Sequence, residues 1–269
     1  MKTMLINGVK YAYRVVGAGE PIVLLHGFTG NQQQWDDVVA GLRDAYQVIT
    51  VDLLGHGATE SPDEWVRYSI QNQSNDLMAL MDSLGHERFH LLGYSMGGRL
   101  ALFMAMTHRE RIKSLILESA SAGLEMMGSR QKRQLKDNAI ADDIEQKGMA
   151  WFVDFWEQLP LWDSQQQLSK QVRDKLRQQR LQNNPRGLAN SLRGMGTGVQ
   201  PSLWDDLGGL DIPIQLIVGE QDEKFVALNY EMYDLFPQSD LHIVFDVGHT
   251  AHLEQLTEFV KVIQSHLAR

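Results

Sequence analysis

The chain has 269 residues, 43% of them hydrophobic and 22% charged, and its net charge of −9 argues against a nucleic-acid scaffold. Cysteine is absent, which excludes disulfides, thiolate metal sites and a cysteine nucleophile and suits a reducing cytoplasm. No apolar run approaches the about 18 residues of a membrane span, and Asn7-Gly8 breaks the N-terminus too early for a signal peptide, so we expect a soluble cytoplasmic protein that binds neither membrane nor nucleic acid.

Short apolar runs alternate with amphipathic segments along most of the chain. Residues 4–11 and 13–16 look like an opening antiparallel pair, with Asn7-Gly8 favouring a tight hairpin. Further strands are predicted at residues 22–25, 47–51, 89–92, 114–117, 214–218 and 242–245. Helical patterns lie between them, for example over residues 71–84, 100–107 and 253–267. The alternation predicts an α/β fold, with a mostly parallel sheet covered by helices on both faces.

The alternation stops near Ala122 and resumes near Asp206. The segment between them predicts a helical cap over the C-terminal edge of the sheet, where open α/β sheets bind ligands. We therefore divide the chain into a first core part (1–121), a cap insertion (122–205) and a second core part (206–269). The cap has 12 Lys+Arg and 10 Asp+Glu, a net charge of +2, whereas the remainder has a net charge of −11. Either the basic lid covers an anionic ligand, or a solvated helix face happens to be basic.

The stretch Gly93-Tyr94-Ser95-Met96-Gly97 lies between a predicted strand and a predicted helix. A strand, a tight glycine-flanked turn and a helix in this order are typical of a nucleophile elbow. The two glycines permit a sharp reversal of the chain, so that the Ser95 hydroxyl stands clear of the strand. The N-terminus of the following helix offers free N–H groups where an oxyanion would sit.

A serine hydroxyl becomes a nucleophile or base when a histidine accepts its proton and a carboxylate orients that histidine. In a nucleophile-elbow fold, the acid and then the histidine follow the serine along the chain, each after a strand. Asp222 and His249 satisfy this order, so we predict a triad of Ser95, Asp222 and His249. Glu220 is the alternative acid. His252 is the alternative histidine, although we expect it to face the helix that it begins.

The stretch from His26 to Gly30 follows the strand predicted at residues 22–25. Such folds place the second oxyanion donor here, so we predict that the backbone N–H groups of Phe28 and Met96 form the oxyanion hole. The His26 imidazole is expected to make structural hydrogen bonds. The turn over residues 52–57 is interpreted as scaffold.

Arg99 lies four residues after Ser95 on an otherwise apolar helix. A guanidinium is costly to bury unless it is paired, so Arg99 either forms an internal salt bridge or holds a substrate carboxylate through two hydrogen bonds. In the cap, a helix predicted over residues 165–182 carries an apolar row that Arg180 continues. That row consists of Leu168, Val172 and Leu176. Arg180 therefore either extends to solvent or points into a cleft.

These stretches resemble the α/β-hydrolase superfamily across the whole chain. In finer detail, they resemble the 2-succinyl-6-hydroxy-2,4-cyclohexadiene-1-carboxylate synthases, enzymes of menaquinone biosynthesis. The motifs that carry this resemblance are residues 93–99, 219–225 and 248–254, with the cap segments 121–124, 155–156 and 180–184. Arg99 is the most telling residue, because many α/β hydrolases have a small or aliphatic residue there.

The resemblance implies a lyase without metal or cofactor that acts on a small anionic substrate with three carboxylates. The enzyme removes a ring proton and expels pyruvate. The residues that match the family's substrate-binding positions are Arg99, Arg133, Arg180, Tyr94 and Trp156, with Arg130 as a rival for Arg133. Trp151 and Trp162 are expected to pack inside the cap.

The triad alone leaves other functions open. A serine hydrolase, either a carboxylesterase or a carbon–carbon bond hydrolase, would use the same three residues. A non-catalytic binding protein with a hydrolase fold is a third interpretation, against which the intact triad argues. We expect a monomer or a small homo-oligomer.

Overall fold

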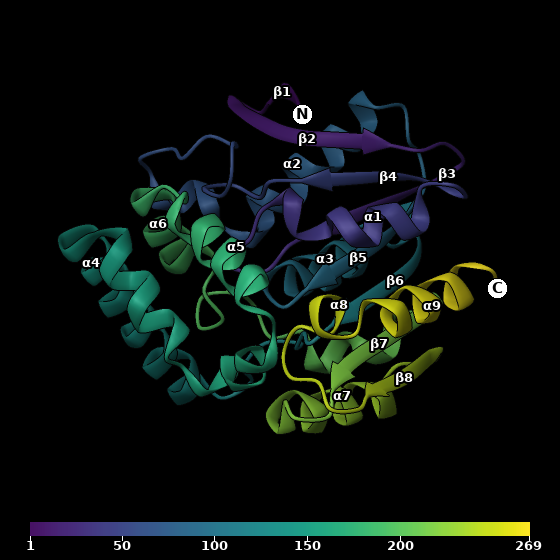
Figure 1. The fold of residues 1–269 in the computed structure, drawn as a ribbon. Coiled ribbons are helices and arrows are strands. Elements are labelled where there is room, and N and C mark those ends of the chain that lie inside the picture. Colours follow the sequence, from purple (N-terminus) through teal and green to yellow (C-terminus); the bar gives the residue numbers. More distant parts are fainter.

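Eight strands form one sheet in the order β1-β2-β4-β3-β5-β6-β7-β8 (Figure 1) in the computed structural model, which describes residues 1–269. The pairs β1–β2 and β2–β4 are antiparallel, and all the others are parallel. The strands are β1 (Lys2–Ile6), β2 (Val9–Val16), β3 (Glu20–Leu25), β4 (Tyr46–Val51), β5 (Phe89–Tyr94), β6 (Ile112–Glu118), β7 (Ile214–Gly219) and β8 (Ser239–Val244). The predicted mostly parallel sheet is confirmed.

The opening hairpin turns at Asn7-Gly8, where both residues have positive φ angles of 46° and 81°. Such angles are typical of the two-residue turns that match strand twist, so the predicted hairpin is confirmed. The predicted boundaries were wrong, because the turn lies inside the range 4–11 and β2 continues without a break through Ala12.

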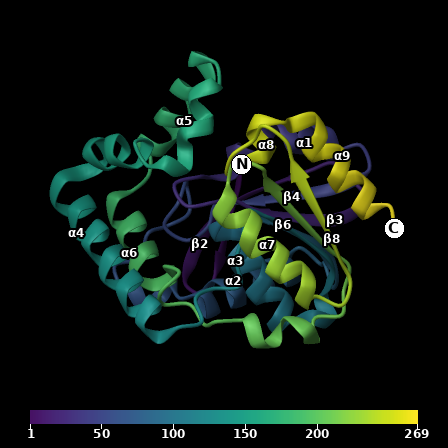
Figure 2. The ribbon, with the colours of Figure 1, turned by 90° about the horizontal axis from the view of Figure 1, so that it is seen from below.

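Helices cover both faces of the sheet (Figure 2). The helices α1 (Asp36–Leu42) and α9 (Leu256–Leu267) pack on one face. The other face is covered by α2 (Ile70–Ser83), α3 (Met96–Thr107) and α7 (Glu223–Leu235). The single helix predicted over residues 253–267 was wrong: Gln255 leaves the helical conformation (φ −137°, ψ 61°) and separates the short α8 (Ala251–Glu254) from α9. Short 3₁₀ segments occur at η1 (Gln32–Trp35), η2 (Trp65–Tyr68), η3 (Arg109–Arg111) and η5 (Trp204–Gly209).

Between β6 and β7 the chain forms only helices, which lie beside the sheet in both views. They are α4 (Met127–Glu157), which is kinked at Gly148, η4 (Pro160–Gln167), α5 (Lys170–Leu181), α6 (Pro185–Met195) and the 3₁₀ segment η5. A small core of its own, which includes Ile144, Phe152 and Leu188, joins α4 to α6. The division at residues 121 and 205 stays a prediction. None of the helices in the chain combines the length and apolar character needed to cross a membrane.

The cap helix predicted over residues 165–182 begins later, at Lys170. The hydroxyl of Ser169 accepts a hydrogen bond from the N–H of Val172 at 3.4 Å and caps the helix. Residues 160–167 form the 3₁₀ segment η4, which starts with a proline. Leu168 therefore lies before α5 and is not part of the row that Arg180 continues.

Candidate active site

Ser95 lies at the junction of β5 and α3 with φ 49° and ψ −105°. This conformation costs about 1–3 kcal/mol and persists only where the surroundings hold it. A Cβ atom at Gly93 would lie 2.3 Å from the Gly97 carbonyl oxygen, and one at Gly97 would lie 2.2 Å from that of Leu25. Only glycine fits at both positions, so the flanking glycines permit the turn that exposes Ser95.

The structure brings the three predicted triad residues together. His249 Nε2 lies 3.0 Å from Ser95 Oγ, and His249 Nδ1 lies 2.6 Å from Asp222 Oδ2. His249 and Asp222 are buried. When Asp222 accepts the Nδ1 hydrogen, Nε2 is free to take the Ser95 proton, so the chain of contacts can move a proton from the serine.

The two alternative residues lie elsewhere. The Glu220 carboxylate accepts a hydrogen bond from the backbone N–H of Asp246 at 3.2 Å, at the surface. The buried His252 places Nδ1 2.8 Å from the carboxylate of Glu118 on β6. The expectation that His252 faces the helix that it begins is confirmed in part: its ring packs on Phe259 of α9 with the centroids 5.9 Å apart, but its Nδ1 contacts Glu118 in the sheet.

The predicted oxyanion donors both border the space above Ser95. The N–H of Phe28 donates to no other group of the chain, and Met96 is the first residue of α3, where N–H groups lack helical partners. The neighbouring His26 accepts a hydrogen bond from the Leu53 N–H at 3.0 Å, and its Nδ1 lies 2.8 Å from the Gly27 carbonyl. Burial lowers the pKa of His26 to about 4, so its ring is neutral and structural.

Ser95 opens into a cavity of about 330 Å³ between the sheet and the cap. Aromatic side chains from both parts line it. They are Phe28, Tyr94, Phe155, Trp156, Trp162 and Phe225. The expectation that Trp162 belongs to cap packing is confirmed in part: its ring packs on Trp156 with the centroids 5.7 Å apart, but it also lies edge-on to His249 with the centroids 5.6 Å apart. Trp151 does pack within the cap, where it stacks on Phe155.

The cavity lining is positively charged. It contains four cationic side chains, Arg99, Arg133, Lys136 and Lys224, and a single carboxylate, that of Asp137. The single N–H of Arg133 Nε is shared between the two carboxylate oxygens of Asp137, at 2.8 and 2.9 Å, which leaves the other nitrogens of that guanidinium without partners in the chain. Neither lysine forms an ion pair, so the cavity has the electrostatic character of an anion site.

Arg99 forms no salt bridge, so the internal pairing considered from the sequence does not occur. Its Nη1 donates to the Met195 carbonyl at 3.0 Å and to Gln200 Oε1. Burial, and then the nearby charge of Arg133, lower the pKa of Arg99 to about 10. The same two causes lower the pKa of Lys224. The charge of Asp137 opposes the pKa shift of Arg99, and that of Asp222 opposes the pKa shift of Lys224, but neither carboxylate forms a salt bridge with these cations.

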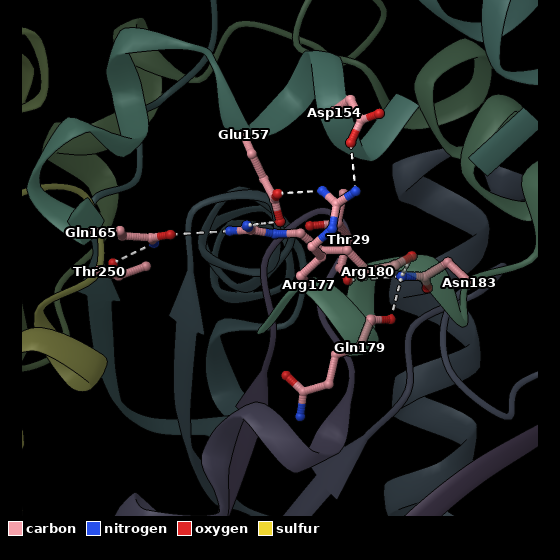
Figure 3. Close-up of polar contacts among 9 residues, drawn as sticks. All are labelled: Thr29, Asp154, Glu157, Gln165, Arg177, Gln179, Arg180, Asn183 and Thr250. Atoms are coloured by element: carbon pink, nitrogen blue, oxygen red, sulfur yellow. Dashed lines mark hydrogen bonds and ion pairs between the residues drawn. The ribbon is translucent and has the colours of Figure 1, made fainter. Parts of the chain in front are cut away.

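Two predicted substrate-binding arginines lie outside the cavity. Arg130 donates to backbone carbonyls of the segment after α6, the shortest bond being 3.0 Å to that of Gln200. Arg180, near the C-terminal end of α5, is buried and donates to Glu157 at 2.9 Å and to Gln165 at 3.1 Å (Figure 3). Its guanidinium also lies over the Trp162 ring. The structure therefore does not bring Arg180 into the Ser95 cavity, because these contacts hold its guanidinium against Glu157, Gln165 and the Trp162 ring.

The sequence interpretation missed four residues of the cavity: Lys136, Lys224, Trp162 and Phe225. Lys136 lies three residues after Arg133, a spacing that places both on one face of α4. Lys224 and Phe225 closely follow Asp222, and the Phe225 ring centroid lies 4.7 Å from that of His249. Helical spacing and nearness to the triad were therefore the signals that pointed to these residues.

The fold and this arrangement around Ser95 define an α/β hydrolase, and the family described as "alpha/beta hydrolase fold" matches residues 20–256. Within that class the chain belongs to the family of the 2-succinyl-6-hydroxy-2,4-cyclohexadiene-1-carboxylate synthases. It is 46% identical, over 97% of its length and 96% of the relative, to a Bacillus subtilis (strain 168) protein provisionally named as such a synthase.

Two further relatives agree with this assignment. The chain is 32% identical to the 2-succinyl-6-hydroxy-2,4-cyclohexadiene-1-carboxylate synthase of Enterobacter sp. (strain 638), over 93% of this chain and 92% of that one. The solved structure of MenH from S. aureus superposes with a TM-score of 0.91 at 35% identity, covering 96% of this chain and 97% of that one.

Proposed function

We propose that this protein is a lyase of menaquinone biosynthesis. It eliminates pyruvate from 2-succinyl-5-enolpyruvyl-6-hydroxy-3-cyclohexene-1-carboxylate and forms 2-succinyl-6-hydroxy-2,4-cyclohexadiene-1-carboxylate. One observation carries the proposal: a serine linked by hydrogen bonds to His249 and Asp222 opens into a cavity with four cations and one carboxylate. The cavity therefore has three positive charges in excess, as many as the negative charges of the three substrate carboxylates.

The Ser95–His249–Asp222 chain acts as a base in this reaction. His249 takes the proton of Ser95, and the Ser95 oxygen takes a proton from the substrate ring. The electrons of the broken C–H bond form the ring double bond at position 2. The electrons of the existing double bond at position 3 move to position 4, and the bond to the enolpyruvyl oxygen at position 5 breaks. The departing enolpyruvate receives a proton from His249 and becomes pyruvate, so no water is consumed.

The remaining residues of the cavity hold the substrate in place. The N–H groups of Phe28 and Met96 stabilise the charge that develops on the succinyl carbonyl. Arg99, Arg133, Lys136 and Lys224 neutralise the carboxylates, and Arg99 has Nε and Nη2 free for a paired contact. Tyr94 and Trp156 form the aromatic wall against the ring. Arg130 and Arg180 hold the cap instead of the substrate.

The test measures pyruvate release from the enolpyruvyl substrate, generated in place by the preceding pathway enzyme, with a nitrophenyl ester assayed in parallel. We expect rapid pyruvate release and negligible ester cleavage. Ester cleavage without pyruvate release would instead identify a serine hydrolase that uses the same triad. If the protein shows neither activity, the result would favour a binding protein.

A further inference from the structure

Two buried amides of the cap reach the two loops that flank Ser95 (Figure 3). Asn183, just after α5, donates from Nδ2 to the carbonyl oxygen of Thr29 at 2.8 Å. Gln165, in η4, donates from Nε2 to Thr250 Oγ1 at 2.9 Å. Thr29 directly follows Phe28, and Thr250 directly follows His249. The cap therefore contacts both the oxyanion loop and the histidine loop, one residue away from the groups that do the chemistry.

Asn183 contacts Thr29, whose backbone conformation is strained. Thr29 has φ 69°, a left-handed conformation that is costly for a β-branched side chain. It belongs to a turn closed by a hydrogen bond of 3.0 Å from the Gly30 N–H to the Gly27 carbonyl. Residues in such conformations persist only where their surroundings hold them. Because Asn183 holds the Thr29 carbonyl, the direction of the Phe28 N–H in the same turn depends on the cap.

Gln165 contacts the loop around His249, which the Glu254 carboxylate also stabilises through hydrogen bonds. Glu254 accepts hydrogen bonds from the Gly248 N–H at 3.0 Å and from Thr250 Oγ1 at 2.7 Å, on either side of His249. A Cβ atom at Gly248 would lie 2.1 Å from Ser164 Oγ, so η4 packs directly on this loop. Gln165 thus fixes the histidine loop from the cap side.

Arg180 connects the two contacts. Its Nη2 donates to Gln165 Oε1 at 3.1 Å, and its own carbonyl oxygen accepts a hydrogen bond from Asn183 Nδ2 at 3.2 Å. Its Nη1 is anchored on Glu157. We propose that Asn183 and Gln165 are positioning residues, which hold the oxyanion loop and the histidine loop in a fixed relation through Arg180. The reaction that they serve rests on the proposed function, but their effect on Ser95 does not.

The variants Asn183→Ala, Asn183→Asp and Gln165→Ala test this proposal. Asn183→Asp keeps the size of the side chain but removes the donor to Thr29. We expect kcat for pyruvate release to fall by about 10- to 100-fold, because small displacements of catalytic groups have effects of this size. KM should change by less than about twofold, since neither amide lines the Ser95 cavity. The matched controls, Gln182→Ala and Gln167→Ala, change exposed glutamines without side-chain hydrogen bonds and should retain wild-type rates.

A second measurement separates this proposal from the proposed function. A nitrophenyl phosphonate should inactivate the protein through Ser95, and this reaction uses both loops without the lyase substrate. We expect the inactivation rate of the variants to fall together with kcat. If the wild-type protein reacts with the phosphonate but releases no pyruvate, the lyase assignment fails. The phosphonate rates of the variants still test whether Asn183 and Gln165 position the two loops.

Three results would overturn the proposal: wild-type rates in Asn183→Asp, an effect confined to KM, or equal losses in the glutamine controls. Thermal unfolding of each variant shows whether it is folded at the assay temperature. If Asn183→Ala does not fold, the isosteric Asn183→Asp and the independent Gln165→Ala decide the question by the same criteria.

Discussion

Two groups of cations lie in regions that Trp162 borders, and their partners differ. In the Ser95 cavity, Arg99 and Lys224 form no salt bridge, and the lining contains four cations but only one carboxylate, that of Asp137. On α5, Arg177 and Arg180 form salt bridges with Asp154 and Glu157, so that two cations face two carboxylates. Cations without acidic partners around a cavity favour a ligand of opposite charge, whereas paired charges hold parts of the protein together. The same residue type therefore serves binding in one group and architecture in the other.

The largest expected effect separates the chemistry of the cavity from its charge. Ser95→Ala removes the proposed base, so we expect pyruvate release to fall by about 10²- to 10⁴-fold, the contribution of a general base. All four cations remain, so the product should bind within about twofold of its wild-type affinity. Turnover assays and titration calorimetry measure the two quantities. Wild-type turnover would remove Ser95 from the mechanism.

Arg99→Ala tests the cations of the Ser95 cavity directly. A charge-assisted hydrogen bond contributes about 1.5–3 kcal/mol, so kcat/KM should fall by about 10- to 150-fold, mainly through KM. Arg99→Lys keeps the charge without the planar fork and should recover only part of this loss. Steady-state kinetics of both variants provide the measurement. An unchanged KM in Arg99→Ala would mean that the unpaired guanidinium does not bind substrate.

Lys224→Met should have a smaller effect. Its ammonium is a more mobile point charge than a guanidinium, so we expect kcat/KM to fall by about tenfold. The exposed Lys132 lies outside the cavity, and Lys132→Met is the matched control, with an expected change of less than about twofold. Equal losses in both variants would show that general surface charge, and not the cavity, attracts the substrate.

The two groups of cations also show which parts of the site can be predicted from the sequence and which cannot. The triad follows from local patterns, because Ser95, Asp222 and His249 each come after a strand whose carboxyl end lies at the same edge of the sheet. The direction of Arg180 depends on where its helix begins and on a glutamate 23 residues earlier in the chain. Periodicity does not reveal such a partner. In the sequence, Lys136 looks like any other exposed lysine. Its place in the cavity depends on how the cap packs over the sheet.

The salt-bridged arginines of α5 provide the last test and the smallest expected effect on affinity. Arg180→Met breaks the partly buried pair with Glu157 and the hydrogen bond to Gln165, so the free energy of unfolding in urea should fall by about 1–3 kcal/mol. Arg177→Met, which removes a more exposed partner of the same glutamate, should cost less than about 1 kcal/mol. In both variants the product should bind within about twofold of the wild-type affinity. If Arg180→Met instead weakens product binding as much as Arg99→Ala does, the guanidinium must leave Glu157 for the ligand. The two groups would then form one site that the cap completes on binding.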